Sequence, residues 1–127
     1  MTEINNIVQK DSFAKFLGIK ILSAGEGTAT GEMIITKNHL NGAGTTHGGA
    51  IFSLGDTVFG AASNSREGLA MAINVSISFF KATTEGKLTA VAEEVSLRKR
   101  LATYVVKIFD ETSTIIALFQ GTVYRKE

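Results

Sequence analysis

The stretch Gly48–Ser65 constrains the fold most, because it predicts a helix that is apolar on nearly every side. Its large apolar residues recur at helical intervals and spread around the cylinder: Ile51, Phe52, Leu54, Val58, Phe59 and Ala62. No Lys, Arg or Glu occurs in this stretch, and Asp56 carries its only charge. Such a helix is normally buried, and a buried carboxylate costs free energy unless it is paired, hydrogen-bonded or used in chemistry. Asp56 is therefore the first candidate functional residue.

The rest of the chain predicts short helices followed by strands. Residues 4–18 have helix-like spacing, and Gly18 is a plausible C-cap. Residues 19–23 and 28–36 predict a hairpin around the Gly25-Glu26-Gly27 turn. After the long helix, four more strands are separated mainly by short turns: 69–80, 87–97, 102–109 and 114–124. Short links imply antiparallel pairing, so the predicted fold class is α+β, with a curved antiparallel sheet wrapped around one long central helix.

The strand at residues 69–80 has the clearest alternation. Large residues alternate with Ala, Asn and Ser: Leu69, Met71, Ile73, Val75, Ile77 and Phe79. We expect the large face to pack against the helix, and the small face to admit another backbone or a ligand.

Length and composition exclude several classes of protein. With 127 residues the chain is expected to form a single domain, residues 1–127. It has no cysteine, which excludes disulfides and cysteine nucleophiles, and its net charge of +1 argues against a nucleic-acid partner. The sequence lacks a signal-peptide pattern and a bilayer-spanning stretch, so we expect a cytoplasmic protein without a membrane partner. One sheet on one helix is a thin core, which favours pairing with a second copy.

Residues 47–65, HGGAIFSLGDTVFGAASNS, with NGAGTT before them, resemble the signature of hotdog-fold acyl-CoA thioesterases. The similarity is greatest to the PaaI-like branch, which is associated with phenylacetic acid degradation. It extends from about Leu17 to Tyr124 and includes the strand ALFQGTVY. The resemblance implies a hotdog fold and a homodimer with antiparallel helices and two shared active sites. Many relatives pair such dimers into tetramers.

Gly48 and Gly49 begin the predicted helix, where backbone N–H groups lack helical partners and the helix dipole is positive. Glycine lets a substrate approach this backbone closely. The terminus could therefore hold the carbonyl oxygen of a thioester as negative charge develops on it. The alternative is that the two glycines only permit a tight turn.

His47 and Asn41 flank this terminus. His47 could hold the loop, donate a hydrogen bond to the carbonyl or contact the leaving thiol. Asn41 could be a turn residue, and the family resemblance implies that it orients the substrate or the attacking group. His39 matches no family role, and we interpret it as a loop residue.

Asp56 lies too far inside the helix to be a cap. It could act as a nucleophile or as a general base on water, and a structural hydrogen bond across a subunit interface is the alternative. Thr57 could position water or the carboxylate, or simply satisfy a backbone carbonyl. Gly48 and Asp56 are separated by roughly 12 Å along the helix. We therefore expect each site to combine Asn41, His47 and Gly48 of one subunit with Asp56 of its neighbour.

Other residues are candidates for binding the acyl-CoA. Basic side chains could meet the phosphates of coenzyme A, although charged residues at a strand corner are usually just solvated: Lys81, Arg98, Lys99, Arg100 and Arg125. Phe59 and Phe79 could line the acyl pocket or belong to the core. Some relatives carry a water-positioning Ser after the helix, where this chain has Ala72, with Asn74 nearby. No metal or redox cofactor is implied, and coenzyme A enters as part of the substrate.

The predicted function is hydrolysis of an aryl-acetyl, aromatic or medium-chain acyl-CoA to the free acid and coenzyme A. The alternative is a non-catalytic module of the same fold that binds or senses acyl-CoA. Asp56 favours the enzyme, because a binding module gains little from a carboxylate beside an ester-like group. A purely structural oligomer is a third possibility.

Overall fold

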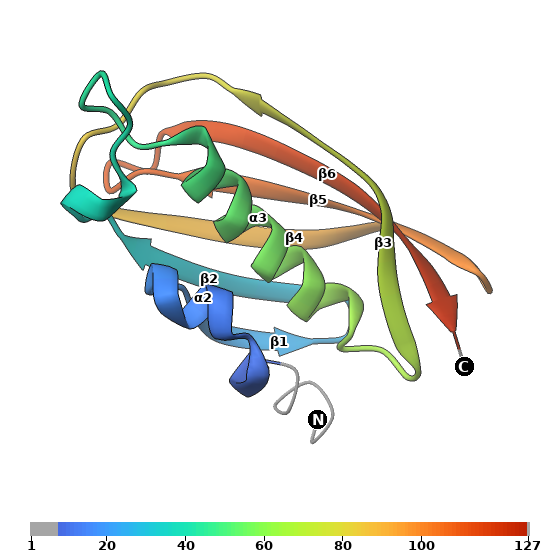
Figure 1. Cartoon of the computed structure of the whole chain (residues 1–127). Helices are drawn as coiled ribbons and strands as arrows, with labels where there is room; N and C mark the ends of the chain where they lie inside the picture. The colour runs from blue at the N-terminus through green and yellow to red at the C-terminus, as the bar shows by residue number, and fades with distance from the viewer. Residues whose placement is uncertain (1–7, 127) are drawn as a thin grey trace.

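The computed structural model describes residues 8–126, in which a curved six-stranded antiparallel sheet wraps around the long helix α3, Gly48–Ser63 (Figure 1). The predicted α+β class is confirmed. The remaining elements follow in chain order: α2 Ser12–Leu17, β1 Lys20–Gly25, β2 Thr28–Ile34, the 3-10 helix η1 Lys37–His39, β3 Leu69–Phe79, β4 Lys87–Leu97, β5 Leu101–Phe109 and β6 Ile115–Lys126.

The N-terminal predictions hold within the described residues. Residues 8–10 are helical, and α2 follows, while the predicted helical positions 4–7 lie outside the described residues. Gly18 ends α2 in the left-handed conformation, with φ +78°. Glu26 and Gly27 also have positive φ, 50° and 81°, and form the tight turn of the predicted hairpin.

The order of strands in the sheet is β1-β2-β4-β5-β6-β3. β3 precedes β4 in the sequence, yet it pairs with β6 at one edge of the sheet, and β4 pairs with β2 instead. The chain therefore passes from the edge strand β3 to the interior strand β4 after Phe79 (Figure 1). This leaves one side of β3 without a neighbouring strand in the described part of the chain.

One face of α3 packs on the concave side of the sheet. Leu54, Val58 and Ala62 are fully buried, and each Leu or Val of this kind stabilises the fold by about 1.5–3 kcal/mol. Helix and sheet approach closely where glycine removes a side chain. A Cβ at Gly121 would lie 2.6 Å from the ring of Phe59.

The prediction that the central helix is buried on nearly every side is wrong for the single chain. Gly49, Ser53, Asp56 and Gly60 lie on one face of α3 at spacings of four, three and four residues, and none of them is buried. Apolar residues are confined to the opposite side and the flanks, because only that side meets the sheet. We call these four residues the open face of α3.

The prediction for β3 is correct for only half of the strand. Its register with β6 shifts between Ala72 and Asn74, so Ile73 forms a β-bulge. Beyond the bulge, Val75 and Ile77 pack against the core. Before the bulge the phase is reversed, because one extra residue exchanges the two faces. Leu69 and Met71 are consequently 47% and 56% exposed.

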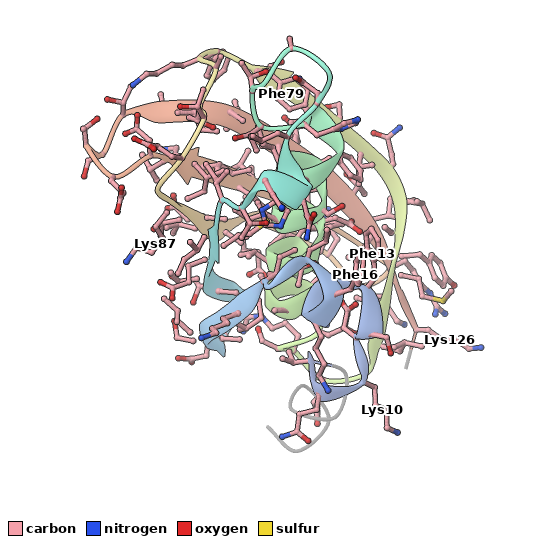
Figure 2. The ribbon with its side chains drawn as sticks, turned by 60° about the vertical axis from the view of Figure 1, so that its left-hand side comes forward. Lys10, Phe13, Phe16, Phe79, Lys87 and Lys126 are labelled. Carbon is pink, nitrogen blue, oxygen red and sulfur yellow. The ribbon has the colours of Figure 1, made fainter. Side chains whose placement is uncertain are left out.

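Further apolar side chains are exposed on α2. Phe13 and Phe16 are 62% and 82% exposed, and Figure 2 labels them next to each other on this helix. Among residues 8–126, no helix has the length and apolar character needed to cross a membrane.

Candidate active site

The N-terminus of α3 is capped by a side chain. His47 precedes the helix, and its Nδ1 accepts a hydrogen bond of 2.8 Å from Gly49 N–H. In the neutral ring the proton is then on Nε2, which leaves this N–H free to donate from the exposed side of the residue. The backbone carbonyl of His47 accepts from Ala50 and Ile51. The His-Gly-Gly motif therefore builds its own cap.

Gly48 N–H is the exception at this terminus. Within residues 8–126 it has no hydrogen-bond acceptor, whereas the next three N–H groups all have one. A cleft of about 370 Å³ lies beside Gly48, lined by Thr45, Thr46, Ile51, Phe79, Phe80, Lys81 and Ala82. A Cβ at Gly48 would lie 3.2 Å from the ring of Phe79, which Figure 2 shows beside the loop before α3. A backbone donor at the positive end of the helix therefore borders a cleft with both apolar and polar lining residues.

Asn41 holds the loop that leads to this terminus. Its Oδ1 accepts from the N–H groups of Ala43 and Thr45, and its Nδ2 donates to Thr45 Oγ1. Thr46 continues the loop and bonds to the carbonyl of Thr83. These contacts match the turn-forming alternative for Asn41, and they fix the approach of the chain to Gly48.

Asp56 lies on the open face of α3 and lines a cavity of about 230 Å³. Contrary to the sequence prediction, it is exposed in the single chain, because the sheet covers the other side of the helix. The described residues provide it with neither a hydrogen bond nor an ion pair. Partial burial, and secondarily the charge of Asp11, raise the pKa of Asp56 above its ordinary value.

The single chain does not bring Gly48 and Asp56 together. They line different cavities and are separated by roughly 12 Å along α3. Thr57, next to Asp56, donates its hydroxyl to the carbonyl of Ser53 at 2.8 Å. This is the hydrogen bond expected if Thr57 only satisfies a backbone carbonyl.

The predicted binding residues are scattered. Phe59 is 1% exposed and packs in the core against Tyr104 and Phe119, so it reaches the Asp56 cavity only at its wall. Asn74 neighbours the inward-facing Val75 and therefore points to the sheet face away from α3. These two placements argue against substrate contact within one chain.

The basic candidates lie at opposite ends of the sheet. Lys81 borders the Gly48 cleft and forms an ion pair of 2.7 Å with Asp110. Arg98, Lys99 and Arg100 form the exposed turn between β4 and β5, at the end of the sheet where β3 begins. Arg125 braces this turn by donating to the carbonyl of Arg98.

Sequence reasoning did not identify Asp11 as a candidate site residue and interpreted His39 only as a loop residue. Asp11 is the N-cap of α2, and it lines the same cavity as Asp56. An Asp directly before a helical pattern is the signal that could have identified the cap. His39 is buried, with Nδ1 accepting from Thr36 N–H and Nε2 donating to the carbonyl of Leu17. It ties the end of α2 to the loop before the site.

Comparisons with known proteins cover nearly the whole chain. A sequence profile of the thioesterase superfamily matches residues 43–117. A relative from Archaeoglobus fulgidus is 48% identical over 118 residues, which are 92% of this chain and 77% of that protein. The acyl-coenzyme A thioesterase PaaI of Escherichia coli is 38% identical over 92% of this chain and 84% of its own length. A solved structure of the Escherichia coli PaaI protein from the phenylacetic acid degradation operon has a TM-score of 0.94 at 35% identity, covering 99% of this chain and 92% of that one.

Proposed function

The chain belongs to the thioesterase superfamily and is a thioester hydrolase, and we propose that its substrate is an aryl-acetyl, aromatic or medium-chain acyl-CoA. The cleft beside Gly48 supports this class, because Ile51, Phe79 and Phe80 give it an apolar lining suited to an acyl or aryl group. The acyl-coenzyme A thioesterase PaaI is among the relatives of this chain.

The observation that carries the proposal is a carboxylate without a partner on the open face of the central helix. Asp56 has no hydrogen bond or ion pair in residues 8–126, and its pKa is raised mainly by burial. A carboxylate with an elevated pKa takes up a proton more readily, which suits a general base, and its free oxygen suits a nucleophile.

The reaction forms one bond and breaks another at the thioester carbon. An oxygen, from water activated by Asp56 or from Asp56 itself, adds to the carbonyl carbon and drives negative charge onto the carbonyl oxygen. The free Gly48 N–H would stabilise this oxyanion, with His47 Nε2–H or Asn41 assisting. The carbon–sulfur bond then breaks, and the sulfur leaves as the thiol of coenzyme A after it gains a proton, which in the general-base route is the proton that Asp56 took from water. If Asp56 itself attacks, the acyl group is left on its carboxylate as a mixed anhydride, and a water molecule hydrolyses this anhydride to give the free acid and restore Asp56.

We propose that two chains share each site. Gly48 and Asp56 do not meet within one chain, whereas two antiparallel α3 helices would bring Asp56 of one copy to Gly48 of the other. Among residues 8–126, nothing covers the open face of α3 or pairs with the outer side of β3, so both are available for such a contact. A two-fold axis would then give two sites per dimer.

The same symmetry gives the basic turn a role. If two β3 strands run antiparallel, the Leu69 end of one lies beside the Phe79 end of the other. The turn Arg98–Arg100 would then be at the same end as the partner's Gly48 cleft. Its positive charge would favour the phosphates of coenzyme A there.

The direct test is thiol release from a panel of acyl-CoA esters, comparing the wild type with Asp56→Asn. We expect the substitution to lower kcat by about 100- to 10,000-fold. Ser53→Ala is a matched control on the same open face, because its hydroxyl only donates to the carbonyl of Gly49. Equal rates for wild type and Asp56→Asn would remove Asp56 from the mechanism. Tight binding of the esters without turnover by the wild type would favour the non-catalytic module.

Complementation tests the shared site. Gly48→Pro and Asp56→Asn chains should each be inactive alone, because each lacks one half of every site. Mixed dimers would contain one intact site out of two, so an equal mixture should regain about one quarter of wild-type activity. No recovery after verified subunit exchange would show that the site lies within one chain.

A further inference from the structure

The cavity beside Asp56 contains a second carboxylate from another element. Asp11 precedes α2, and its side chain lines the same cavity of about 230 Å³ as Asp56. Its Oδ1 accepts a hydrogen bond of 3.0 Å from Ala14 N–H, which fixes the direction of the carboxylate. Asp11 is half-buried, so water does not fully screen its charge.

Nothing else around the cavity offsets this pair of charges. The titratable side chains that line it within residues 8–126 are Asp11 and Asp56, although the segment before α2, α3, β3, β6 and the residue after α3 all contribute to the wall. The polar neighbours direct their donors elsewhere. Thr57 donates to the carbonyl of Ser53, Ser63 to that of Gly60, and the Asn64 amide to those of Gly60 and Ala70.

We propose that Asp11 is a positioning residue of this site, whose fixed negative charge opposes a second one on Asp56 and so makes Asp56 a stronger proton acceptor. The inference rests on the proposed function, because it assigns a purpose to Asp56 as base or nucleophile. The pKa of Asp56 is raised first by burial and then by the charge of Asp11, in agreement with this geometry. A base is more effective when its pKa moves toward the working pH.

The position of Asp11 is held from both ends of α2. At the start of the helix its own cap orients it. At the other end, Gly18 terminates α2, and the buried His39 donates from Nε2 to the carbonyl of Leu17. His39 also accepts through its carbonyl from His47 N–H. The helix that carries Asp11 is thus tied to the loop that carries the oxyanion donor.

Two substitutions separate the charge of Asp11 from its capping role. Asp11→Asn removes the charge and keeps a good N-cap, whereas Asp11→Glu keeps the charge on a poorer cap. We expect the acid limb of the kcat/KM profile to move to lower pH in Asp11→Asn and to stay at the wild-type position in Asp11→Glu. Thermal stability should instead stay near the wild-type value in Asp11→Asn, which keeps a good cap, and fall in Asp11→Glu, which has a poorer one. An acid limb that is unchanged in Asp11→Asn, or that moves equally in both variants, would overturn the proposal.

A second readout does not depend on turnover. The Asp56 carboxyl carbon can be followed by NMR during a pH titration, with its signal assigned by its absence in Asp56→Asn. We expect its midpoint to be lower in Asp11→Asn than in the wild type, and an equal midpoint would overturn the inference. If the wild type released no thiol from any ester, the proposed function would fail, while this titration would still decide the role of Asp11.

Discussion

Glu94 on β4 and Asp56 on α3 are both carboxylates, and the structure surrounds them in opposite ways. Glu94, on β4, accepts from both Nε and Nη2 of Arg66 and from the hydroxyl of Tyr104, at 3.3, 2.8 and 2.7 Å. Burial opposes its charge, but these hydrogen bonds outweigh it and lower the pKa of Glu94. Asp56 receives no hydrogen bond in the described residues, and its partial burial raises its pKa.

This difference distinguishes the Glu94 cluster, which is a structural site, from Asp56, which belongs to a candidate catalytic site. The Glu94 cluster joins the loop after α3, two strands and the turn of the first hairpin, since the carboxylate also packs over Gly27. Both carboxylate oxygens of Glu94 and the Tyr104 hydroxyl are hydrogen-bonded in it. In residues 8–126, Asp56 and the Gly48 N–H are left without partners, whereas no buried side-chain nitrogen or oxygen there lacks one. Unpartnered groups are the ones available to a substrate.

After Asp56→Asn, the largest effect on kcat is expected from a substitution at Gly48. Gly48 is the first residue of α3, where proline is tolerated because its missing N–H has no helical partner. His47 before it has φ −62° and ψ 134°, which are compatible with a following proline. Gly48→Pro should therefore keep the helix and remove the free donor, lowering kcat by about 100- to 1,000-fold.

Gly48→Ala is the control for this substitution. It adds the same first carbon against Phe79, at 3.2 Å, but retains the N–H. We expect its kcat to stay much closer to that of the wild type. Similar losses in both variants would assign the effect to crowding and not to the donor.

Glu94→Gln should show the reverse pattern, with a loss of stability and little change in kcat. The amide keeps the shape of the side chain but loses the charge that strengthens three hydrogen bonds. We expect the free energy of unfolding to fall by about 1–3 kcal/mol, measured by urea denaturation. Glu93→Gln, on the exposed face of the same strand, should change it by less than about 0.5 kcal/mol. A loss of activity without a loss of stability would break the contrast.

The contributions of the two carboxylates to stability should also change in opposite directions with pH. Glu94 has a lowered pKa, so its contribution is present above its ordinary pKa and is lost as the pH falls through the lowered value. Asp56 has a raised pKa, so it favours the fold at low pH and loses that contribution as the pH rises through the raised value.

The measurement is the unfolding free energy of Glu94→Gln and Asp56→Asn relative to the wild type across the acidic range. As the pH rises, Glu94→Gln should become progressively less stable than the wild type and Asp56→Asn progressively more stable. If both variants became progressively less stable than the wild type as the pH rises, Asp56 would have a stabilising partner in the assembled protein.

The sequence anticipated what depends on local patterns and missed what depends on distant pairing. The bounds of α3 and of the first hairpin follow from periodicity and turn residues, and Asp56 was identifiable as the only charge in an apolar helix. The bulge at Ile73 and the pairing of β3 with β6 join segments far apart in the chain, so alternation alone predicted the wrong outward face near Leu69. Asp11 and Asp56 line the same cavity because α2 packs against α3.

The smallest effect is expected at Thr57, which separates nearness to the site from participation in it. Thr57 lines the cavity of Asp56, but its hydroxyl already donates to the carbonyl of Ser53 at 2.8 Å. Like the groups around Glu94, the Thr57 hydroxyl therefore already has a hydrogen-bond partner. Thr57→Val should change kcat by no more than about threefold, or roughly 0.6 kcal/mol, in the same thiol-release assay. A loss of a hundredfold, restored in Thr57→Ser, would show that the hydroxyl leaves Ser53 to hold water or the carboxylate during the reaction.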